Sequence, residues 1–272
     1  MAQSGASVLS SGWIEDGKAL DIHFTGDAAA VRAAVEGAFD RTDAIVQKTA
    51  DRTRSLIIAD MDSTMITIEC IDELADYAGI KPQIAEVTER AMRGELDFEE
   101  ALRSRVALLK GLSENVIDQC LVERVVIMPG ARALVQTIRA QGGMAILVSG
   151  GFTRFADPVA TEIGFNKAIA NRLGIRDGML TGRVEGNIVG AQTKRKALMD
   201  ALSAYELRTS ASLAVGDGAN DIPMIEAAGL GVAYHAKPMV RRSASHAISR
   251  FGLDAILYLL GFSDYDLQQL ER

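Results

Sequence analysis

Much of the sequence after residue 54 repeats one pattern, in which a short apolar run ends in Asp, Ser or Gly and a helix-like segment follows. Apolar runs without polar alternation are typical of strands that are buried on both faces. Helix-length connections indicate that neighbouring strands run parallel. The pattern predicts an α/β fold, a doubly wound parallel sheet with helices on both faces. The predicted strands are 55–59, 144–149, 212–216 and 230–234, and the predicted helices are 131–140, 153–163 and 220–228.

Two segments depart from this alternation. Residues 67–128 have helical patterns and no convincing strand, which predicts a helical cap inserted after the first core strand. Its clearest helix is predicted over 97–111, because Asp97 and Glu100 form a capping-box pattern at its start. Residues 172–186 place turn-forming Gly and Asp between short apolar segments, which predicts an antiparallel hairpin.

The N-terminal residues predict a small α+β unit. Residues 19–24 alternate like a strand, 27–39 have a helical period, and 43–49 are a candidate second strand. The charged segment 50–55 is predicted to be a linker into the first core strand. We therefore expect three parts: an N-terminal unit over 1–54, a core over 55–66 and 129–272, and the cap over 67–128.

Composition excludes several classes of function. The 272 residues carry 29 Lys and Arg against 36 Asp and Glu, a net charge of -7, with no basic stripe, which argues against nucleic-acid binding. No secretory signal and no apolar run of about 20 residues is visible, so we expect no membrane association. Cys70 and Cys120 lack a second thiol at metal or redox spacing, so we expect free thiols and a cytoplasmic location.

Polar residues follow the predicted strands. Asp60 and Asp62 follow the first strand, Ser149 ends the next, and Asp217 and Asp221 follow a later one. Because the carboxyl ends of parallel strands meet at one rim, the four aspartates should converge. Crowded carboxylates repel one another unless a cation lies between them, and oxygen-rich surroundings favour Mg²⁺. The sequence therefore predicts a magnesium site.

Two other interpretations of these loops compete with the metal site. Asp and Gly are common in strand-to-helix loops as turn formers and helix caps, which would account for any one loop alone. Their joint occurrence favours the metal site. A dinucleotide-binding fingerprint does not fit, because Gly216 and Gly218 lack the third glycine, whose place Asp221 takes, and no GxxxxGK[ST] motif occurs.

The motifs resemble those of the haloacid dehalogenase superfamily. They are Asp60-Met61-Asp62-Ser63-Thr64, Ser149-Gly150-Gly151, Lys194 and Gly216-Asp217-Gly218-Ala219-Asn220-Asp221. Within that superfamily, segments 68–75 and 102–109 resemble the phosphoserine phosphatases, and the resemblance covers about 56–262. It implies a HAD-like, Rossmann-type core and Mg²⁺-dependent hydrolysis of O-phospho-L-serine to L-serine and phosphate, the last step of serine biosynthesis.

The resemblance implies a role for each matched aspartate. Asp60 matches the nucleophile, which forms an aspartyl-phosphate that water later hydrolyses. Asp62 matches the acid that protonates the departing serine oxygen and then activates water. The metal would take the Asp60 and Asp217 carboxylates and the Asp62 backbone carbonyl. Asp221 would support that set of ligands.

The resemblance also implies the groups that hold the phosphate. Ser149, the Gly150 amide and Lys194 match the donors and the cation that a transferring phosphoryl group needs. Asn220 matches a further polar contact to phosphate or substrate. The basic residues of segment 193–198 leave a solvated helix start as the alternative for Lys194, although the motif favours it as the site lysine.

Substrate recognition is expected to come from the cap. Arg105 falls within the apolar stripe of its predicted helix, and a buried guanidinium needs a partner. The resemblance implies that Arg105 receives the substrate carboxylate and Glu69 the ammonium. An internal ion pair, or a side chain that reaches water, is the alternative for Arg105. Met92 and Phe98 match apolar cap positions that cover the site, and a plain core role suits each equally well.

Other classes of function remain as alternatives. A phosphotransferase on the same scaffold would pass the phosphoryl group from Asp60 to homoserine or another small alcohol. The N-terminal unit resembles a degenerate amino-acid-binding domain, for which a part in dimerisation or stability is favoured over ligand sensing, so a homodimer is an open expectation. A binding protein without catalysis would show substitutions at Asp60, Asp62, Lys194 or Asp217, and all four are present.

Overall fold

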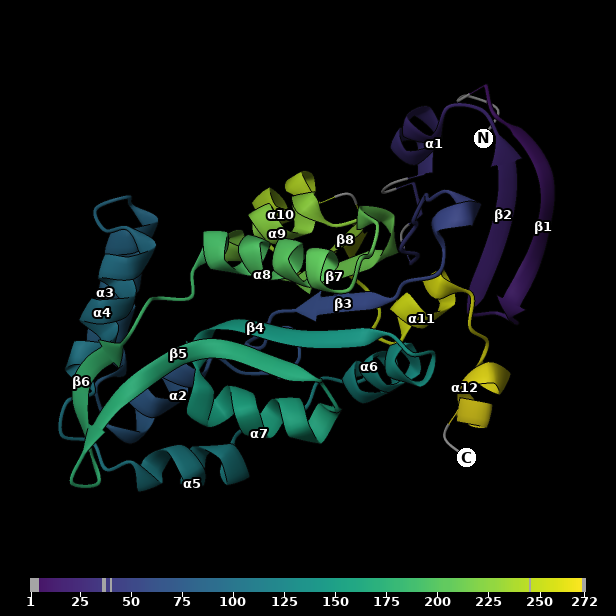
Figure 1. The fold of residues 1–272 in the computed structure, drawn as a ribbon. Coiled ribbons are helices and arrows are strands. Elements are labelled where there is room, and N and C mark those ends of the chain that lie inside the picture. The colour runs from purple at the N-terminus through teal and green to yellow at the C-terminus, as the bar shows by residue number, and fades with distance from the viewer. Residues whose placement is uncertain (1–4, 36–37, 40, 245, 271–272) are drawn as a thin grey trace.

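A seven-stranded sheet in the order β6-β5-β4-β3-β7-β8-β9 forms the centre of the protein (Figure 1). The computed structural model describes residues 5–35, 38–39, 41–244 and 246–270, with the backbone alone for Met92 and 268–270. Neighbouring strands are parallel except β5 and β6, which form the predicted antiparallel hairpin. The strands are β3 (Leu56–Ala59), β4 (Met144–Phe152), β5 (Lys167–Arg176), β6 (Met179–Glu185), β7 (Ser212–Gly216), β8 (Leu230–Tyr234) and β9 (His246–Ile248).

Helices cover both faces of this sheet, which confirms the predicted doubly wound fold (Figure 1). Ile57 and Ala59 of β3 belong to one apolar cluster, whereas Leu56 and Ile58 belong to a second. Both faces of β3 are therefore buried, which explains why its sequence is a continuous apolar run. The helices outside the cap and the N-terminal unit are α6 (Ala131–Ala140), α7 (Thr153–Ile163), α8 (Ala191–Ala204), η3 (Thr209–Ala211), η4 (Ala219–Asp221), α9 (Ile222–Ala227), α10 (Pro238–Ser243), α11 (Ala255–Leu260) and α12 (Asp264–Leu270).

Four helices lie between β3 and α6, where a helical cap was predicted. They are α2 (Cys70–Tyr77), α3 (Lys81–Met92), α4 (Phe98–Leu108) and α5 (Asn115–Glu123). The capping box of α4 is confirmed, because the Glu100 amide donates to Asp97 Oδ1 at 2.8 Å and the Asp97 amide donates to Glu100 Oε2 at 3.0 Å. The cap lies at the end of the sheet toward which β3 points (Figure 1). The cap therefore lies next to the carboxyl ends of the parallel strands.

The N-terminal unit lies at the opposite end (Figure 1). It contains β1 (Ser7–Glu15), β2 (Ala19–Thr25), α1 (Ala28–Val35) and η2 (Thr49–Asp51). The strand predicted over 43–49 is wrong, because residues 42–48 have no regular structure and their polar groups bond to the core instead. The Val46 carbonyl lies 2.7 Å from His246 Nε2, and Gln47 Nε2 donates to the Leu259 carbonyl at 2.7 Å. The strand that pairs with β2 is β1, which the sequence did not indicate.

Two further expectations concern membranes and thiols. Within the described ranges, no helix combines the length and the apolar character that a bilayer crossing requires. Cys70 and Cys120 are both buried, and neither forms a disulfide. The predicted helix over 27–39 is shorter in the structure, since α1 ends at Val35 and residues 36–37 lie outside the described part of the chain.

Candidate active site

Asp60 lies directly after β3, where the buried strand reaches the rim of the sheet. Its side chain is buried, and Oδ2 lies 2.7 Å from the ammonium of Lys194. Oδ1 accepts a hydrogen bond from the Met61 amide at 2.7 Å. The Met61 carbonyl in turn accepts from the amides of Met65 and Ile66, at 2.8 and 3.0 Å, so the chain turns tightly here. This turn holds the Asp60 carboxylate at the end of the strand.

Lys194 of α8 is completely buried and contacts two carboxylates. Its ammonium lies 2.7 Å from Asp60 Oδ2 and 2.7 Å from Asp221 Oδ1. Burial alone would lower the pKa of Lys194, but the charges of Asp221 and Asp60 outweigh it and raise that pKa above its usual value. Gly216 makes room for this arrangement, because a methyl group there would lie 2.4 Å from Cγ of Asp221. The lysine therefore stays charged at the centre of the site.

Three carboxylates converge beside this lysine. Carboxylate oxygens of Asp60, Asp217 and Asp221 all lie within 4.8 Å of one another. Thr64 Oγ1 donates to Asp217 Oδ1 at 2.8 Å. Burial and the nearby charge of Asp60 raise the pKa of Asp217 to about 6, and the same two causes raise the pKa of Asp221. One lysine does not balance this negative charge, and a set of oxygen ligands fits a hard divalent cation.

Asp62 lies two residues beyond Asp60 at the same rim. Its Oδ1 is buried and has no hydrogen-bond partner among the described residues. Burial, reinforced by the charge of Glu69, raises the pKa of Asp62 well above its usual value. Gly151 permits this position, because a methyl group there would lie 2.9 Å from Asp62 Oδ2. This environment favours the protonated form of the Asp62 carboxyl group.

The end of β4 supplies the opposite wall of the site. Ser149 is completely buried, and its Oγ accepts a hydrogen bond from the Gly151 amide at 2.8 Å. Asn171 of β5 donates from Nδ2 to the Gly150 carbonyl at 2.7 Å and accepts from the Val189 amide at 2.8 Å. Asn171 therefore joins two loops of the site. Sequence reasoning missed it, because Asn171 lies next to Arg172 in β5 and the pair leaves no pattern that marks one of them as a site residue.

Glu69 and Arg105 face the site from the cap. Glu69 precedes α2, and its Oε1 accepts a hydrogen bond from Ser63 Oγ at 2.6 Å. Arg105 is half-buried on α4 and donates to a main-chain carbonyl one turn earlier at 3.3 Å. No described carboxylate lies within 4 Å of its guanidinium. Burial lowers the pKa of Arg105, while the charges of Asp72, Glu69 and Asp62 act against that change.

Phe98, at the first turn of α4, reaches across to the core. A methyl group on Gly150 would lie 3.2 Å from its Cζ, and one on Gly190 would lie 3.3 Å from its Cδ1. Asn220 is half-buried in η4, beside the acidic cluster. The side chain of Met92 lies outside the described residues. The structure thus gathers the predicted core residues at one rim and sets Glu69, Arg105 and Phe98 on the cap side.

Comparisons with known proteins cover most of the chain. Residues 57–226 match the model of the haloacid dehalogenase-like hydrolase family. The chain is 48% identical over 217 residues to the phosphoserine phosphatase SerB2 of Mycobacterium tuberculosis, which covers 80% of this chain and 53% of that protein. It is 48% identical over 210 residues to a phosphoserine phosphatase of Polaromonas sp., which covers 75% of this chain and 89% of that protein. The chain therefore spans about half the length of the first relative and most of the second.

A solved structure extends the likeness toward the N-terminus. The unliganded crystal structure of a probable phosphoserine phosphatase from Vibrio cholerae matches with a TM-score of 0.75 and 41% identity. The match covers 91% of this chain and 77% of that chain. Such coverage must include residues that precede β3. The similarity therefore concerns the N-terminal unit as well as the sheet and the cap.

Proposed function

Because the chain belongs to the haloacid dehalogenase-like hydrolase family and, within it, to the phosphoserine phosphatases, we propose that it hydrolyses O-phospho-L-serine to L-serine and phosphate. This reaction is the last step of serine biosynthesis. The observation that carries the proposal is the position of Asp60, buried against Lys194 and beside Asp217 and Asp221. Such a carboxylate is fixed in place and has a cation next to it where the phosphate would bind.

Asp60 is the nucleophile, and Asp62 is the acid and then the base. A carboxylate oxygen of Asp60 bonds to phosphorus while the bond between phosphorus and the serine oxygen breaks, and Asp62 gives that oxygen its proton. Asp62, now ionised, accepts a proton from water, whose oxygen bonds to phosphorus and releases Asp60. The raised pKa and the unpartnered Oδ1 of Asp62 support both parts of this role.

Mg²⁺ is the proposed metal. Hydrolases of this family depend on a metal, and the carboxylates of Asp60 and Asp217 with the main-chain carbonyl of Asp62 are the proposed ligands, supported by Asp221. When bound, Mg²⁺ offsets the repulsion between the nucleophilic carboxylate and the phosphate oxygens. The crowding of Asp60, Asp217 and Asp221 and the all-oxygen chemistry of the site support this choice.

The phosphate oxygens are held by four groups: the Ser149 hydroxyl, the Gly150 amide, Lys194 and Asn220. The Ser149 hydroxyl accepts from the Gly151 amide, which leaves its own proton free to be donated. Asn171 supports the loop by fixing the Gly150 carbonyl. Donors that are already in place need little reorganisation when charge develops on the phosphoryl group.

Arg105 and Glu69 select the amino-acid end of the substrate. Arg105 pairs with the carboxylate and Glu69 with the ammonium, which suits a zwitterionic head group. The absence of a carboxylate within 4 Å of Arg105 among the described residues supports this role, since an internal ion pair would leave the guanidinium occupied. Phe98 covers the site, and Met92 is proposed to do so as well.

The organisation of the chain is part of the proposal. Residues 67–128 form a cap that opens and closes over a core of 55–66 and 129–272. Residues 1–54 form a separate unit whose part is in stability or dimerisation. Two buried free thiols and a role in amino-acid biosynthesis support a location in the cytoplasm.

The test separates recognition from chemistry. Arg105→Ala and Glu69→Gln should lower kcat/KM for phosphoserine by roughly 30-fold to several-thousand-fold, the usual cost of breaking one buried charge pair. An aryl phosphate carries neither head-group charge, so its slower Mg²⁺-dependent hydrolysis should stay within a few-fold of wild type. The measurement is phosphate release from both substrates.

Arg103→Ala is the matched control. Arg103 lies on the same helix, α4, and pairs with Glu99 at the surface, so its loss should leave both substrates unaffected. A parallel fall of both substrates in the Arg105 and Glu69 variants would contradict the assigned specificity. With homoserine present, phosphate release should still equal serine release. Transfer of the phosphoryl group to homoserine would instead identify a phosphotransferase.

A further inference from the structure

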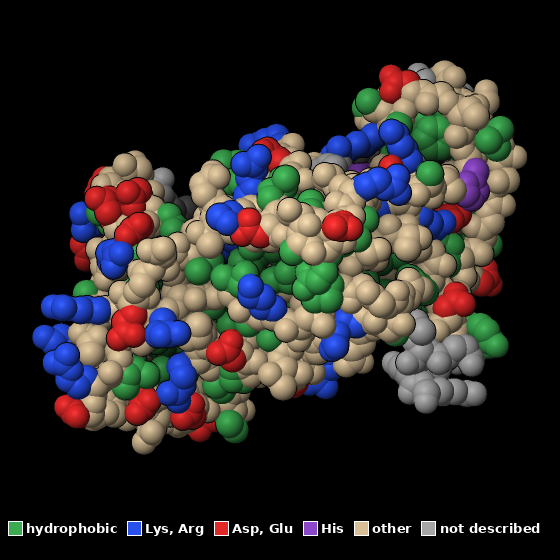
Figure 2. Space-filling view, in the orientation of Figure 1, with side chains coloured by type: hydrophobic (Ala, Val, Ile, Leu, Met, Phe, Trp, Pro, Cys, Tyr) green, Lys and Arg blue, Asp and Glu red, His purple; other side chains and the backbone are tan. Residues whose placement is uncertain are grey.

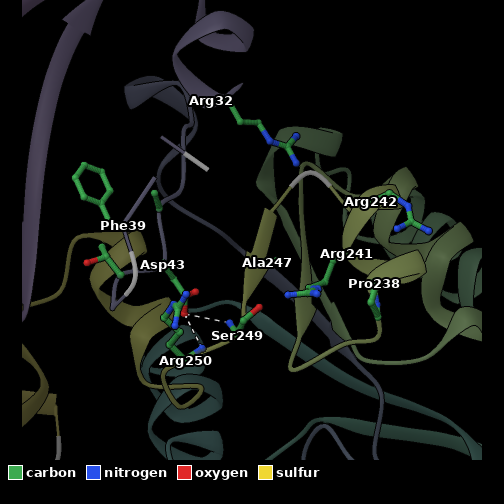
Figure 3. Close-up of a pocket in the computed structure, with 11 residues that line it drawn as sticks. Arg32, Phe39, Asp43, Pro238, Arg241, Arg242, Ala247, Ser249 and Arg250 are labelled. Atoms are coloured by element: carbon green, nitrogen blue, oxygen red, sulfur yellow. Dashed lines mark hydrogen bonds between the residues drawn. The ribbon is translucent and has the colours of Figure 1, made fainter. Parts of the chain in front are cut away.

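A cavity of about 510 Å³ lies where the N-terminal unit meets the core (Figure 3). Its walls come from α1, the chain around Asp43, α10 and the end of β9. The proposed catalytic aspartates follow β3 and β7, whereas β9 is an edge strand of the sheet, separated from β7 by β8. The cavity is therefore distinct from the proposed catalytic site.

Arginines dominate the described lining of this cavity. Arg32 comes from α1, Arg241 and Arg242 from α10, and Arg250 from the segment after β9. Figure 3 shows Arg32, Arg241 and Arg250 around the same space, with Arg241 pointing toward Ser249. On the face seen in Figure 2, Lys and Arg side chains gather between α10 and the N-terminal unit. This positive region stands out in a chain whose net charge is -7.

The described lining offers little negative charge to Arg241, Arg242 and Arg250. Its one carboxylate, Asp43, accepts hydrogen bonds from the amides of Ser249 and Arg250 at 3.1 and 3.0 Å. In the part of the chain that the structure describes, no carboxylate lies within 4 Å of the guanidinium groups of Arg241, Arg242 or Arg250. The positive charge of these three guanidinium groups is therefore available to a ligand.

The helix dipole accounts for only part of this arrangement. Arg241 and Arg242 lie in the last turn of α10, where a cation is favoured in any helix. Arg32 and Arg250 come from other elements. Arg32 donates to the Ala244 carbonyl at 2.9 Å, which holds α1 against the end of α10. The convergence thus depends on the docking of the N-terminal unit, and helix stability alone does not explain it.

We propose that this cavity binds a small soluble anion that carries two or more phosphate groups. A guanidinium group binds phosphate oxygens through two parallel hydrogen bonds. Asp43, the one carboxylate of the described lining, does not occupy Arg241, Arg242 or Arg250 in this way. Sites for small molecules typically occupy about 300–1,000 Å³, and a single phosphate would leave most of this volume empty. Because α1 supplies one wall, the bound anion also ties the N-terminal unit to the core.

Calorimetric titration of the full chain with inorganic pyrophosphate, in metal-free buffer, tests the site. The wild type should bind one pyrophosphate, and at least about tenfold more tightly than orthophosphate, since two phosphates engage more than one arginine. The double variant Arg241→Ser and Arg250→Ser should bind pyrophosphate at least about tenfold more weakly. Arg208→Ser is the matched control, because Arg208 is exposed and lies outside the cavity. This variant should bind pyrophosphate as tightly as the wild type.

The proposed catalytic site is the competing location for pyrophosphate. If the double variant binds pyrophosphate as tightly as the wild type, the anion occupies the catalytic site and the proposal is wrong. Equal affinity for orthophosphate and pyrophosphate would also overturn it. The double variant should retain wild-type phosphatase activity, which shows that it is folded. If it does not fold, the single variant Arg241→Gln, on the exposed face of α10, should weaken binding in the same direction.

Discussion

At the scale of single residues, the ammonium of one buried lysine contacts two carboxylates. Lys194 is fully buried, so its ammonium is stable only because Asp60 and Asp221 both lie 2.7 Å away. The ammonium of Lys194 in turn offsets the charge of Asp60, which lies beside Asp217 and Asp221. No cation among the described residues forms an ion pair with Asp62, and burial favours its protonated form. These different surroundings agree with the different roles proposed for the two carboxyl groups, nucleophile for Asp60 and acid for Asp62.

Substituting these two aspartates should have different effects. Asp60→Asn should abolish turnover and leave the fold intact, because an amide does not form an acyl-phosphate. Asp62→Asn keeps the nucleophile and should lose the acid-base contribution of roughly 10²–10⁴-fold, so that phosphoenzyme forms slowly. Phosphate release and phosphoenzyme trapping by mass spectrometry measure the two effects. Wild-type phosphate release by purified Asp60→Asn would remove Asp60 from the mechanism.

The two cysteines should be inert in the native protein. Burial raises the pKa of Cys120 to about 11, and burial likewise raises the pKa of Cys70 well above its usual value. Only the thiolate reacts with a disulfide reagent, so at pH 8 the native protein should react at least about a hundredfold more slowly than the unfolded chain. The native rate should increase with pH, because deprotonation is what limits it. Native reaction at the unfolded rate would show that these thiols are accessible.

At the scale of elements, the sequence predicted those helices and strands that have a buried face. The helices α6 and α7 and the strands β7 and β8 match their predicted ranges, since each has a 3.6-residue or a continuous apolar pattern. β1 was missed because most of its side chains are exposed, which leaves no alternation to detect. Segment 43–49 has a strand-like composition, but its bonding partners belong to the core. β9 has only three residues, too few for a periodic signal.

The same distinction applies to the site. Asp60, Ser149 and Asp217 could be predicted from the ends of the expected strands, because parallel strands bring their carboxyl ends to one rim. Supporting contacts from distant parts of the chain leave no local pattern. Asn171 holds the Gly150 loop from β5, and its two hydrogen bonds depend on the register between β4 and β5. Such a residue is identified only when the tertiary structure is known.

The connections of the cap should respond to ligand. The two chain crossings between cap and core are paired, because the Thr67 amide donates to the Val126 carbonyl at 3.0 Å and the Met128 amide donates to the Met65 carbonyl at 2.9 Å. Arg124 lies exposed beside this pair. Trypsin cleavage after Arg124 should slow at least severalfold when Mg²⁺ and a phosphate-mimicking metal fluoride hold the cap closed.

Cleavage after Arg208 is the internal reference for that experiment. Arg208 is exposed in a loop of the core, away from both crossings, so its rate of cleavage should not depend on ligand. Equal slowing at both positions would indicate inhibition of the protease or general stabilisation. No slowing at Arg124 under saturating ligand would contradict a closing cap.

At the scale of the whole molecule, one arginine joins the N-terminal unit to the far end of the core. Arg52 pairs with both carboxylate oxygens of Asp21 on β2. The same guanidinium donates to the carbonyls of Tyr258 and Leu259 in α11, at 2.9 and 3.1 Å. Its side chain is only 22% exposed, so these bonds are partly shielded from water. The two-stranded β1–β2 sheet depends on such contacts, because an isolated hairpin has only marginal stability in water.

Arg52→Ala should therefore loosen the N-terminal unit and leave the chemistry unchanged. Loss of several charge-assisted bonds, reduced by their partial exposure, should lower the free energy of unfolding by roughly 1–3 kcal/mol. Trp13, the only tryptophan, lies in β1, so its fluorescence during urea unfolding reports on this unit directly. Arg132→Ala removes an exposed pair with Glu162 and should cost about 0–1 kcal/mol. Equal effects of the two substitutions would mean that Arg52 does not anchor the unit, and a fall in kcat for Arg52→Ala would connect the unit to catalysis.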